Sequence, residues 1–273
     1  GNLNGAQFSG FTNTIRGNVT GLQMAGFVNL AWGNLEGAQF AGFVNTVRGK
    51  SNGAQFAGFV NTCIDTVIGF QGAGVVNFSN KFTHGAQLAG FANITVNRVE
   101  GAQIGFFNYA KELDGSQVGF FNYSKECKGV PVGFLSYVNN GYHKLEVSAD
   151  EIFYTNVAFR SGVNAFHNNI FAGIRPDNFE RPLWTFGYGI GSTIKLSKKV
   201  ALDIDLSSQQ VVEEDNIEAI NLINKGYVGF DFQLAPKFSL AVGATVNGQL
   251  TETDYSNYPD IFNNYNPHLL YEH

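Results

Sequence analysis

The chain has 273 residues, of which 14% are charged, and its formal net charge is −5 at pH 7. Soluble domains average about 25% charged residues, and a net negative chain lacks the basic surface that binds nucleic acid. No apolar run reaches the roughly 18 residues of a membrane-spanning helix. These features argue against nucleic-acid binding and an inner-membrane helical span, and the length suits two domains of about 140 and 130 residues.

Residues 1–140 consist of nine copies of one motif, Gly-x-Gln-x-x-Gly-Phe-x-Asn. Its first Gly recurs every 16 residues, and every 14 residues in the last two copies. These glycines are Gly5, Gly21, Gly37, Gly53, Gly69, Gly85, Gly101, Gly115 and Gly129. The ninth copy has Pro131 in place of Gln and Ser136 in place of Asn, as a capping or junction repeat does. A fixed period of this size predicts a repeat domain in which each unit stacks on the next.

Charged residues avoid one half of every unit. Between the first Gly and the Asn of the eight full copies there is no Lys, Arg, Asp or Glu, whereas the linker halves carry all the charges of this region. Because burying an unpaired charge is costly, the Gly-to-Asn half is predicted to be packed and the linker half to face water.

The repeated Gln and Asn predict two hydrogen-bonded ladders. In stacked identical units, each side-chain amide donates to one neighbour and accepts from the other. The ladder residues include Gln39, Gln55, Gln87, Gln103, Asn45, Asn61, Asn93 and Asn108. The glycines remove side chains where the backbone comes close or turns sharply, and Phe rings of successive units are expected to stack. This interpretation explains every fixed position without a ligand.

A β-solenoid with one coil of 14–16 residues per unit accounts best for the repeats. Helix is disfavoured because each interior Gly costs about 1 kcal/mol. An antiparallel sheet with one strand per unit stays open as the alternative, although the units do not alternate as its connections would require. Cys63 and Cys127 lie four repeats apart, which at about 4.8 Å per coil is too far for a disulfide.

Residues 141–273 form a second predicted domain, in which apolar and polar or small residues alternate. Seven strands are predicted, at 143–149, 152–163, 169–175, 183–196, 199–208, 226–234 and 237–250. Long strands with this pattern are typical of a transmembrane β-barrel, apolar outside and polar inside. A soluble sandwich or lipocalin-like barrel with the apolar face inward is the alternative. Because single-chain bacterial barrels have even strand numbers, we expect an antiparallel barrel of about eight strands whose last strand is missing from this chain.

The connections between these strands predict the orientation of the barrel. Tight turns at 197–199 and 235–237 contrast with long polar segments at 207–225 and after Leu250. Bacterial barrels have short periplasmic turns and long extracellular loops. Counting strands back from the turns places the repeats in the periplasm, whereas one miscounted strand would place them at the cell surface. The last loop has the composition of a binding surface, and its candidate residues are Tyr255, Tyr258 and Tyr265.

The sequence contains no motif that predicts catalysis. None of the five histidines, His84, His143, His167, His268 and His273, pairs at metal-ligand spacing, and surface or loop positions are expected for them. Asp203, Asp205 and Asp231 are expected to pair with Lys195, Arg160 and Arg175 inside the barrel, which at eight strands is filled by side chains. We therefore predict no catalytic residue, no metal site, no cofactor and no enzyme activity.

Segments from both halves resemble a family of Gram-negative outer-membrane surface-repeat proteins. The resemblance lies in the units at 101–109 and 115–123, both of the form Gly-x-Gln-x-Gly-Phe-Phe-Asn-Tyr, and in 141–150 and 153–160. Members carry tandem Gly-x-Gln-x-Gly-x-x-Asn units followed by a barrel-like tail. The resemblance implies an outer-membrane or surface location and supplies no catalytic residues.

Together these patterns predict a non-enzymatic structural or interaction protein. A barrel around residues 141–250, in contact with membrane lipid, would anchor a repeat arm. The arm would dock onto other outer-membrane or periplasmic proteins, and no nucleic-acid partner is predicted. The alternative is a protein that binds or handles a small molecule or glycan at the cell surface through the Tyr- and Asn-rich loops.

Overall fold

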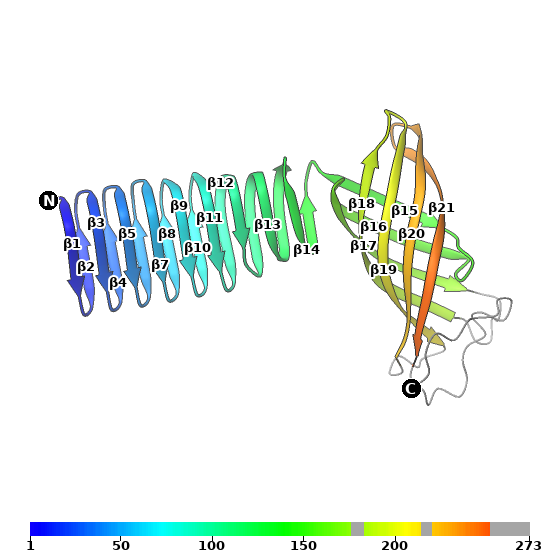
Figure 1. The fold of residues 1–273 in the computed structure, drawn as a ribbon, viewed down its shortest axis with the longest axis horizontal. Coiled ribbons are helices and arrows are strands. Elements are labelled where there is room, and N and C mark those ends of the chain that lie inside the picture. Colours follow the sequence, from blue (N-terminus) through cyan, green and yellow to red (C-terminus); the bar gives the residue numbers. More distant parts are fainter. Residues whose placement is uncertain (176–182, 214–219, 252–273) are drawn as a thin grey trace. The chain divides into compact units, whose positions relative to one another are not determined.

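The computed structural model describes residues 1–175, 183–213 and 220–251, and all of its regular structure is β-strand. It contains two compact units, residues 1–141 and 142–273 (Figure 1). Within the described ranges, no helix has the length and apolar character needed to cross a membrane.

The first unit is a β-solenoid whose coils each supply a strand to two faces (Figure 1). One face holds β1 (Leu3–Ser9), β3 (Val19–Ala25), β5 (Leu35–Ala41), β7 (Ser51–Ala57), β9 (Thr66–Ala73) and β11 (Phe82–Ala89). The other holds β2 (Thr12–Ile15), β4 (Val28–Ala31), β6 (Val44–Val47), β8 (Val60–Cys63) and β10 (Val76–Ser79). The longer β12 (Ala92–Ile104) pairs with β10 through its first residues and with β11 through its last, and β13 (Phe107–Cys127) and β14 (Val130–Val138) continue the stack.

Every pairing in the solenoid is parallel and aligns equivalent residues of successive units. Gln23 lies opposite Gln39, and Asn29 opposite Asn45. The solenoid is therefore confirmed, and the antiparallel alternative is wrong. The physical reason is that only a parallel register places each amide directly above its equivalent.

Both predicted ladders are present inside the coils. Gln39 Nε2 donates to Gln23 Oε1 at 2.9 Å, and the Gln series continues in the same way to Gln117. Asn45 Nδ2 donates to Asn61 Oδ1 at 3.0 Å, and this series runs to Asn122. The Gln amides donate toward the preceding coil, whereas the Asn amides donate toward the following coil. The two ladders therefore run in opposite directions.

The predicted division of each unit into a packed half and a solvated half is wrong. Buried Gln39 and Ala41 alternate with the exposed Phe40, and the buried Leu35 belongs to a linker half. Successive side chains of a strand point to opposite sides, so both halves contribute to the interior and both to the surface. The charge-free half of each unit therefore forms part of an apolar surface as well as part of the core.

The first glycine of each motif has a backbone conformation that other residues rarely adopt. Gly53 has a φ of +132°, and a Cβ atom on it would lie 1.9 Å from the carbonyl oxygen of Gly37. The coils therefore approach each other at a distance that only glycine permits, as predicted.

The second unit is a seven-stranded antiparallel sheet in sequence order, curled into an open half-barrel (Figure 1). Its strands are β15 (Tyr142–Ser148), β16 (Thr155–Val163), β17 (Phe166–Arg175), β18 (Leu183–Lys195), β19 (Val200–Glu213), β20 (Asn221–Ala235) and β21 (Phe238–Thr251). All seven predicted strands are present, and both tight turns lie where expected.

Several predicted strand boundaries are wrong. β19 and β20 extend into the segment predicted as a loop, because residues such as Gln209 continue the alternation as inward polar side chains. The strand predicted from residue 152 begins at Thr155, because Ile152 and Phe153 fold inward onto Val211 in a small apolar cluster.

Among the described residues the sheet does not close, so the predicted eight-stranded barrel is not formed. Its edge strands, β15 and β21, are not paired with each other. In an antiparallel meander of seven strands, the first and last run in the same direction. Direct closure would therefore require a parallel pair.

Candidate functional site

Aromatic side chains form a continuous column on the surface of the solenoid. The column consists of Phe11, Phe27, Phe43, Phe59, Phe91, Phe106, Phe120 and Phe134, with Val75 as its one aliphatic position. Phe27 and Phe43 stack with ring centroids 4.8 Å apart and planes inclined by 2°, and Phe43 and Phe59 do the same. Stacking is thus confirmed, but each ring is 40–65% exposed. The rings form a surface.

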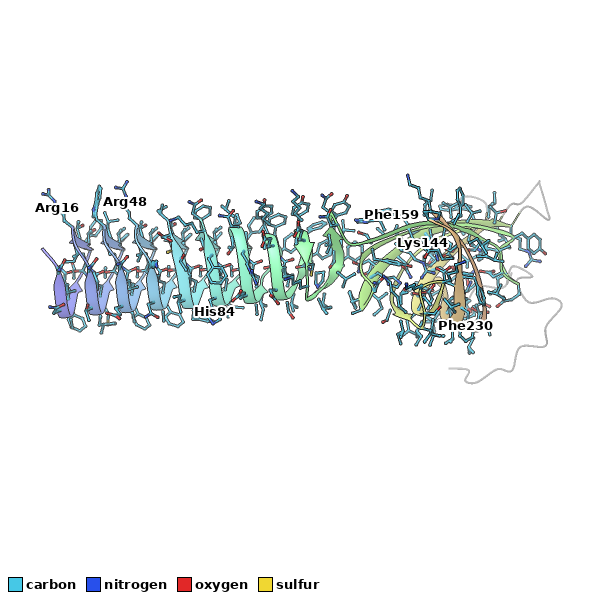
Figure 2. The ribbon with its side chains drawn as sticks, turned by 90° about the horizontal axis from the view of Figure 1, so that it is seen from above. Arg16, Arg48, His84, Lys144, Phe159 and Phe230 are labelled. Carbon is cyan, nitrogen blue, oxygen red and sulfur yellow. The ribbon has the colours of Figure 1, made fainter. Side chains whose placement is uncertain are left out.

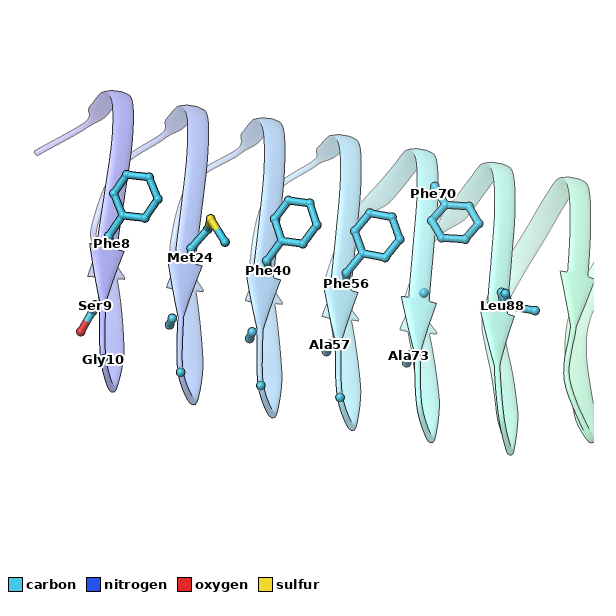
Figure 3. A pocket seen from close by; sticks show the side chains of 16 residues that line it. Phe8, Ser9, Gly10, Met24, Phe40, Phe56, Ala57, Phe70, Ala73 and Leu88 are labelled. Carbon is cyan, nitrogen blue, oxygen red and sulfur yellow. The ribbon is translucent and has the colours of Figure 1, made fainter.

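A second column borders an apolar groove of about 870 Å³ (Figure 3). Its wall is made by Phe8, Met24, Phe40, Phe56, Phe70 and Leu88, over small residues such as Ala57 and Ala73 (Figure 3). In the fifth unit Gly72 takes the wall position, and the Phe70 ring leans over it, 5.3 Å from the Phe56 ring. Phe70, which stands opposite Ala54 and Ala86 of the neighbouring coils, therefore supplies the aromatic ring that Gly72 lacks. Among the residues that the structure describes, none that lines the groove is charged.

Charged side chains of the solenoid pair along its linker segments. Lys81 Nζ lies 2.8 Å from Asp65 Oδ2, and its hydrogen bond lowers the pKa of that carboxyl below its ordinary value. His84 is exposed and lies 3.2 Å from Glu100, and the Arg48 guanidinium covers the Trp32 ring at 4.1 Å (Figure 2). These pairs are separate from the groove, which leaves the apolar face uncharged.

The two faces of the curled sheet have opposite polarity. Its outward side chains are large, apolar and exposed, and they include Phe159 and Phe230 (Figure 2). Other outward members include Leu145, Val147, Val157, Ile170, Ile174, Phe186, Ile190, Ile194, Ile204, Leu206, Val228, Phe232, Leu240, Val242 and Val246. The concave face carries buried polar residues, namely Asn156, Arg160, His167, Asn169, Thr185, Thr193, Asp203, Asp205 and Gln209. The interior of this sheet is more polar than its exterior.

Ion pairs cross the concave face between strands far apart in sequence. Arg160 lies 3.0 Å from Glu146 and 2.8 Å from Asp205, and Lys144 lies 2.7 Å from Asp231. Asp203 accepts from Thr193 Oγ1 at 2.6 Å. Buried charges with opposite partners avoid the cost of isolated ones. The ion pairs expected inside the barrel are therefore present around these aspartates.

Two of the predicted cationic partners are wrong. Lys195 is exposed at the end of β18, and Arg175 lies over the Tyr154 ring at 5.4 Å. Lys144, which was not predicted, takes their place. Its position at 144, in alternation with Tyr142 and Glu146, was the available signal for an inward side chain.

The prediction that all histidines lie on the surface or in loops is wrong for His167. It is fully buried in β17, with Nε2 3.1 Å from Asp205 Oδ1. The contact crosses Gly191, where a Cβ atom would lie 1.8 Å from Asp205 Oδ1. Because Gly191 has no side chain, His167 of β17 and Asp205 of β19 can meet across β18.

A cavity of about 960 Å³ lies along the concave face, bordered by both edge strands, β15 and β21. Arg160, Asn169, Asp205, Gln209 and Tyr227 contribute to its lining. Within the described ranges, no group of three or more His, Cys, Asp or Glu residues could hold a metal ion.

The remaining predicted site residues are placed as follows. The ladder residues lie inside the coils, where they hydrogen bond to one another and to backbone carbonyls. Tyr255, Tyr258 and Tyr265 lie outside the described residues, so their binding role stays a prediction.

Comparison with known proteins identifies no family for this chain. No family model, no curated protein and no solved structure matches it. The sequence resemblance stays a prediction, and the geometry of the two units carries the functional argument.

Proposed function

We propose that this chain is a non-enzymatic structural or interaction protein of the bacterial outer membrane. The curled sheet is its membrane anchor, in contact with lipid along the outward side chains of β15 to β21. The repeat stack is an arm that docks onto other outer-membrane or periplasmic proteins.

The reversed polarity of the sheet is the observation that carries this proposal. A lipocalin-like or sandwich sheet turns its apolar face toward its own core, whereas this sheet turns paired charges inward and exposes Phe159, Ile190 and Phe230. Exposing so many large apolar side chains to water is unfavourable, at about 25 cal/mol per Å². A lipid environment removes that cost, as in transmembrane barrels with polar interiors.

An eighth strand would complete the proposed anchor as a closed barrel. A strand that runs opposite to both β15 and β21 pairs with each of them antiparallel, which satisfies both open edges and gives the even number of bacterial barrels. The polar concave face then becomes the interior of the barrel.

The repeat stack supports a docking role through its surface. Exposed apolar patches of large size mark interaction sites on soluble parts of proteins. The aromatic column and the neighbouring groove together form such a patch, without charge, along most of the stack. The Gln and Asn ladders join successive coils up to the ninth unit and hold this surface in place, so that docking requires little ordering.

Insertion into lipid is tested by the fluorescence of Trp184, which lies on β18 beside Phe186. In a Trp32→Phe background, we expect vesicles of dibrominated phosphatidylcholine to quench Trp184. Phe230→Arg places a charge on the outward face at a cost of about 2–4 kcal/mol at mid-bilayer, and quenching should be lost. The matched control is Ser207→Arg on the concave face, where the cavity has room for the side chain.

Quenching in the control and not in Phe230→Arg supports the anchor. An unquenched Trp184 in the parent protein would rule it out.

Docking is tested by purification of the intact protein from gently solubilised outer membranes. We expect specific envelope proteins to accompany it, and to be lost from a Phe43→Ser/Phe59→Ser variant, whose altered side chains are exposed and therefore tolerated. Lys50→Ser, also exposed, is the matched control. A protein that runs alone, or companions that survive the double substitution, would refute docking through the aromatic column.

A further inference from the structure

The proposed anchor gives no role to the cavity of about 960 Å³ on the concave face. Ligand pockets in proteins have volumes of roughly 300–1,000 Å³, so the cavity is large enough for a small molecule. Its lining comes mainly from β15, β16, β17, β19, β20 and β21.

The charges around this cavity already neutralise one another. Four carboxylates line it, Glu146, Asp150, Glu151 and Asp205, and four cationic side chains, Lys144, Arg160, Lys225 and Lys237. Arg160 pairs with two of the carboxylates, Lys225 with Asp150, and Lys144 with the nearby Asp231. Glu151 accepts hydrogen bonds from Thr245 and Asn247. The cavity therefore offers no excess charge to an anionic or a cationic ligand.

Among the residues that line the cavity, buried polar atoms without a hydrogen-bond partner belong to the ion-paired Glu146, Arg160 and Asp205 and to two neutral amides, Asn169 and Gln209. Gln209 lines the cavity and is only 2% exposed, and its Nε2 atom has no hydrogen-bond partner. Asn169 also lines the cavity and is 5% exposed; its Nδ2 donates to Asp205, whereas its Oδ1 has no partner. Buried polar atoms are rarely left unsatisfied in native structures. A donor and an acceptor thus stand ready for a ligand that supplies both.

Two aromatic side chains add apolar contact surface. Phe171 of β17 and Tyr227 of β20 both line the cavity. Their register partners include Gly187 on β18 and Asp205 on β19, so the rings lie at the levels of Gln209 and Asp205 respectively. A ligand suited to these groups is uncharged, carries both a hydrogen-bond donor and an acceptor, and has apolar faces, a combination that sugars have in their hydroxyls and C–H faces.

We propose that this cavity is a binding site for a neutral saccharide. Sugar hydroxyls donate to Asn169 Oδ1 and accept from Gln209 Nε2, and the C–H faces of the ring pack on Phe171 or Tyr227. The groups assigned to the sugar, Asn169, Gln209, Phe171 and Tyr227, lie neither on the outward face of the sheet nor in the solenoid, so the site is distinct from the lipid-facing surface and from the docking surface.

Isothermal titration calorimetry of the intact chain tests the site, in a detergent without a sugar headgroup. The probes are maltose, cellobiose and N,N′-diacetylchitobiose, with spermidine and glucuronate as charged comparisons. We expect at least one neutral disaccharide to bind and neither charged probe to do so. Failure of all three disaccharides to bind, or equal binding of a charged probe, would overturn the proposal.

Substitution of Gln209 distinguishes an effect on sugar affinity from an effect on the stability of the fold. Gln209→Leu removes an unpartnered buried amide, so the variant should be at least as stable as the parent while its affinity falls about tenfold, the equivalent of one hydrogen bond. Gln210→Leu alters the neighbouring residue of β19, which points to the other face, and should bind as the parent does. Unchanged affinity in Gln209→Leu would show that the amide does not contact the sugar and would refute the assignment.

Discussion

At the scale of single residues, the interior of the solenoid is stabilised by amides that satisfy one another. Each Gln and Asn is fully buried in the middle coils, yet each donates to its equivalent 16 residues away at about 3 Å. The Gln ladder ends at Gln117, whose Oε1 has no hydrogen-bond partner because Pro131 stands opposite it. The degenerate ninth unit is thus where the ladder stops.

Replacing a central rung should cost more than replacing the last one. Gln55→Met leaves two buried groups unpaired, Gln71 Nε2 and Gln39 Oε1, at about 1–3 kcal/mol each. Gln117→Met unpairs one ladder group, Gln103 Oε1, and removes a longer hydrogen bond of 3.4 Å to the Tyr123 carbonyl. Urea denaturation followed by circular dichroism should therefore show about twice the loss of stability for Gln55→Met. Equal losses would contradict the ladder as a source of stability.

Burial of Cys63 predicts a stability change at alkaline pH. The thiol is inaccessible to solvent, and desolvation raises its pKa from 9.0 to about 11. Because the folded state holds the proton more tightly, its contribution is fully present below pH 9 and lost as the pH rises toward 11, on the order of 2–3 kcal/mol. The free energy of unfolding should thus fall more steeply between pH 8 and 11 in the parent than in Cys63→Ala. Parallel pH profiles would show that the thiol does not titrate in this range.

At the scale of elements, the sequence predicted the strands and ladders but not the direction of the Phe side chains. Strict repetition of Gln39, Asn45 and their equivalents required a parallel stack. Charge avoidance did not reveal that Phe40 and Phe43 are exposed, because an apolar surface and an apolar core exclude charge equally.

In the sheet, alternation located all seven strands, yet it could not show which face was inward. Contacts between strands show which face is inward. His167 and Asp205, which are 38 residues apart in the sequence, meet on the concave face. The cavity residues Asn169 and Gln209 have no motif by which sequence could have identified them, since their feature is a missing partner in three dimensions.

The second glycine of the motif should be essential only where it faces the backbone of a preceding coil. A Cβ atom on Gly58 would lie 2.0 Å from the carbonyl oxygen of Gly42, whereas one on Gly10, at the same motif position in the first coil, meets nothing within 4 Å. Gly58→Ala should therefore destabilise the solenoid by about 1–3 kcal/mol, as overpacking does, and Gly10→Ala should have little effect. Thermal denaturation of the two variants makes the comparison. Similar melting temperatures would mean that the coils can separate without cost.

At the scale of the whole molecule, two units are stabilised by different interactions. In the solenoid each coil contacts its neighbours, so stability accumulates coil by coil. In the sheet, ion pairs link strands that are not adjacent across the polar concave face. The two tryptophans report on them separately, since Trp32 lies in the first unit and Trp184 in the second.

Single-tryptophan variants should therefore unfold at different denaturant concentrations. Trp184→Phe leaves Trp32 to report on the solenoid, and Trp32→Phe leaves Trp184 to report on the sheet. We expect Gly58→Ala to lower the midpoint observed by Trp32 and to leave that of Trp184 unchanged, with fluorescence in guanidinium chloride as the measurement. A common midpoint that shifts in both reporters would show that the units unfold as one.

The opposite directions of the Gln and Asn ladders bear on how long such a stack can become. An amide group carries a dipole of about 3.5 D, and aligned amides add up as they do in a helix. Here every coil adds one Gln dipole and one Asn dipole that point oppositely, so the sum stays near zero at any length. Gain or loss of a 16-residue coil therefore leaves the net dipole of the two ladders unchanged, and the ladders set no electrostatic limit on the number of coils.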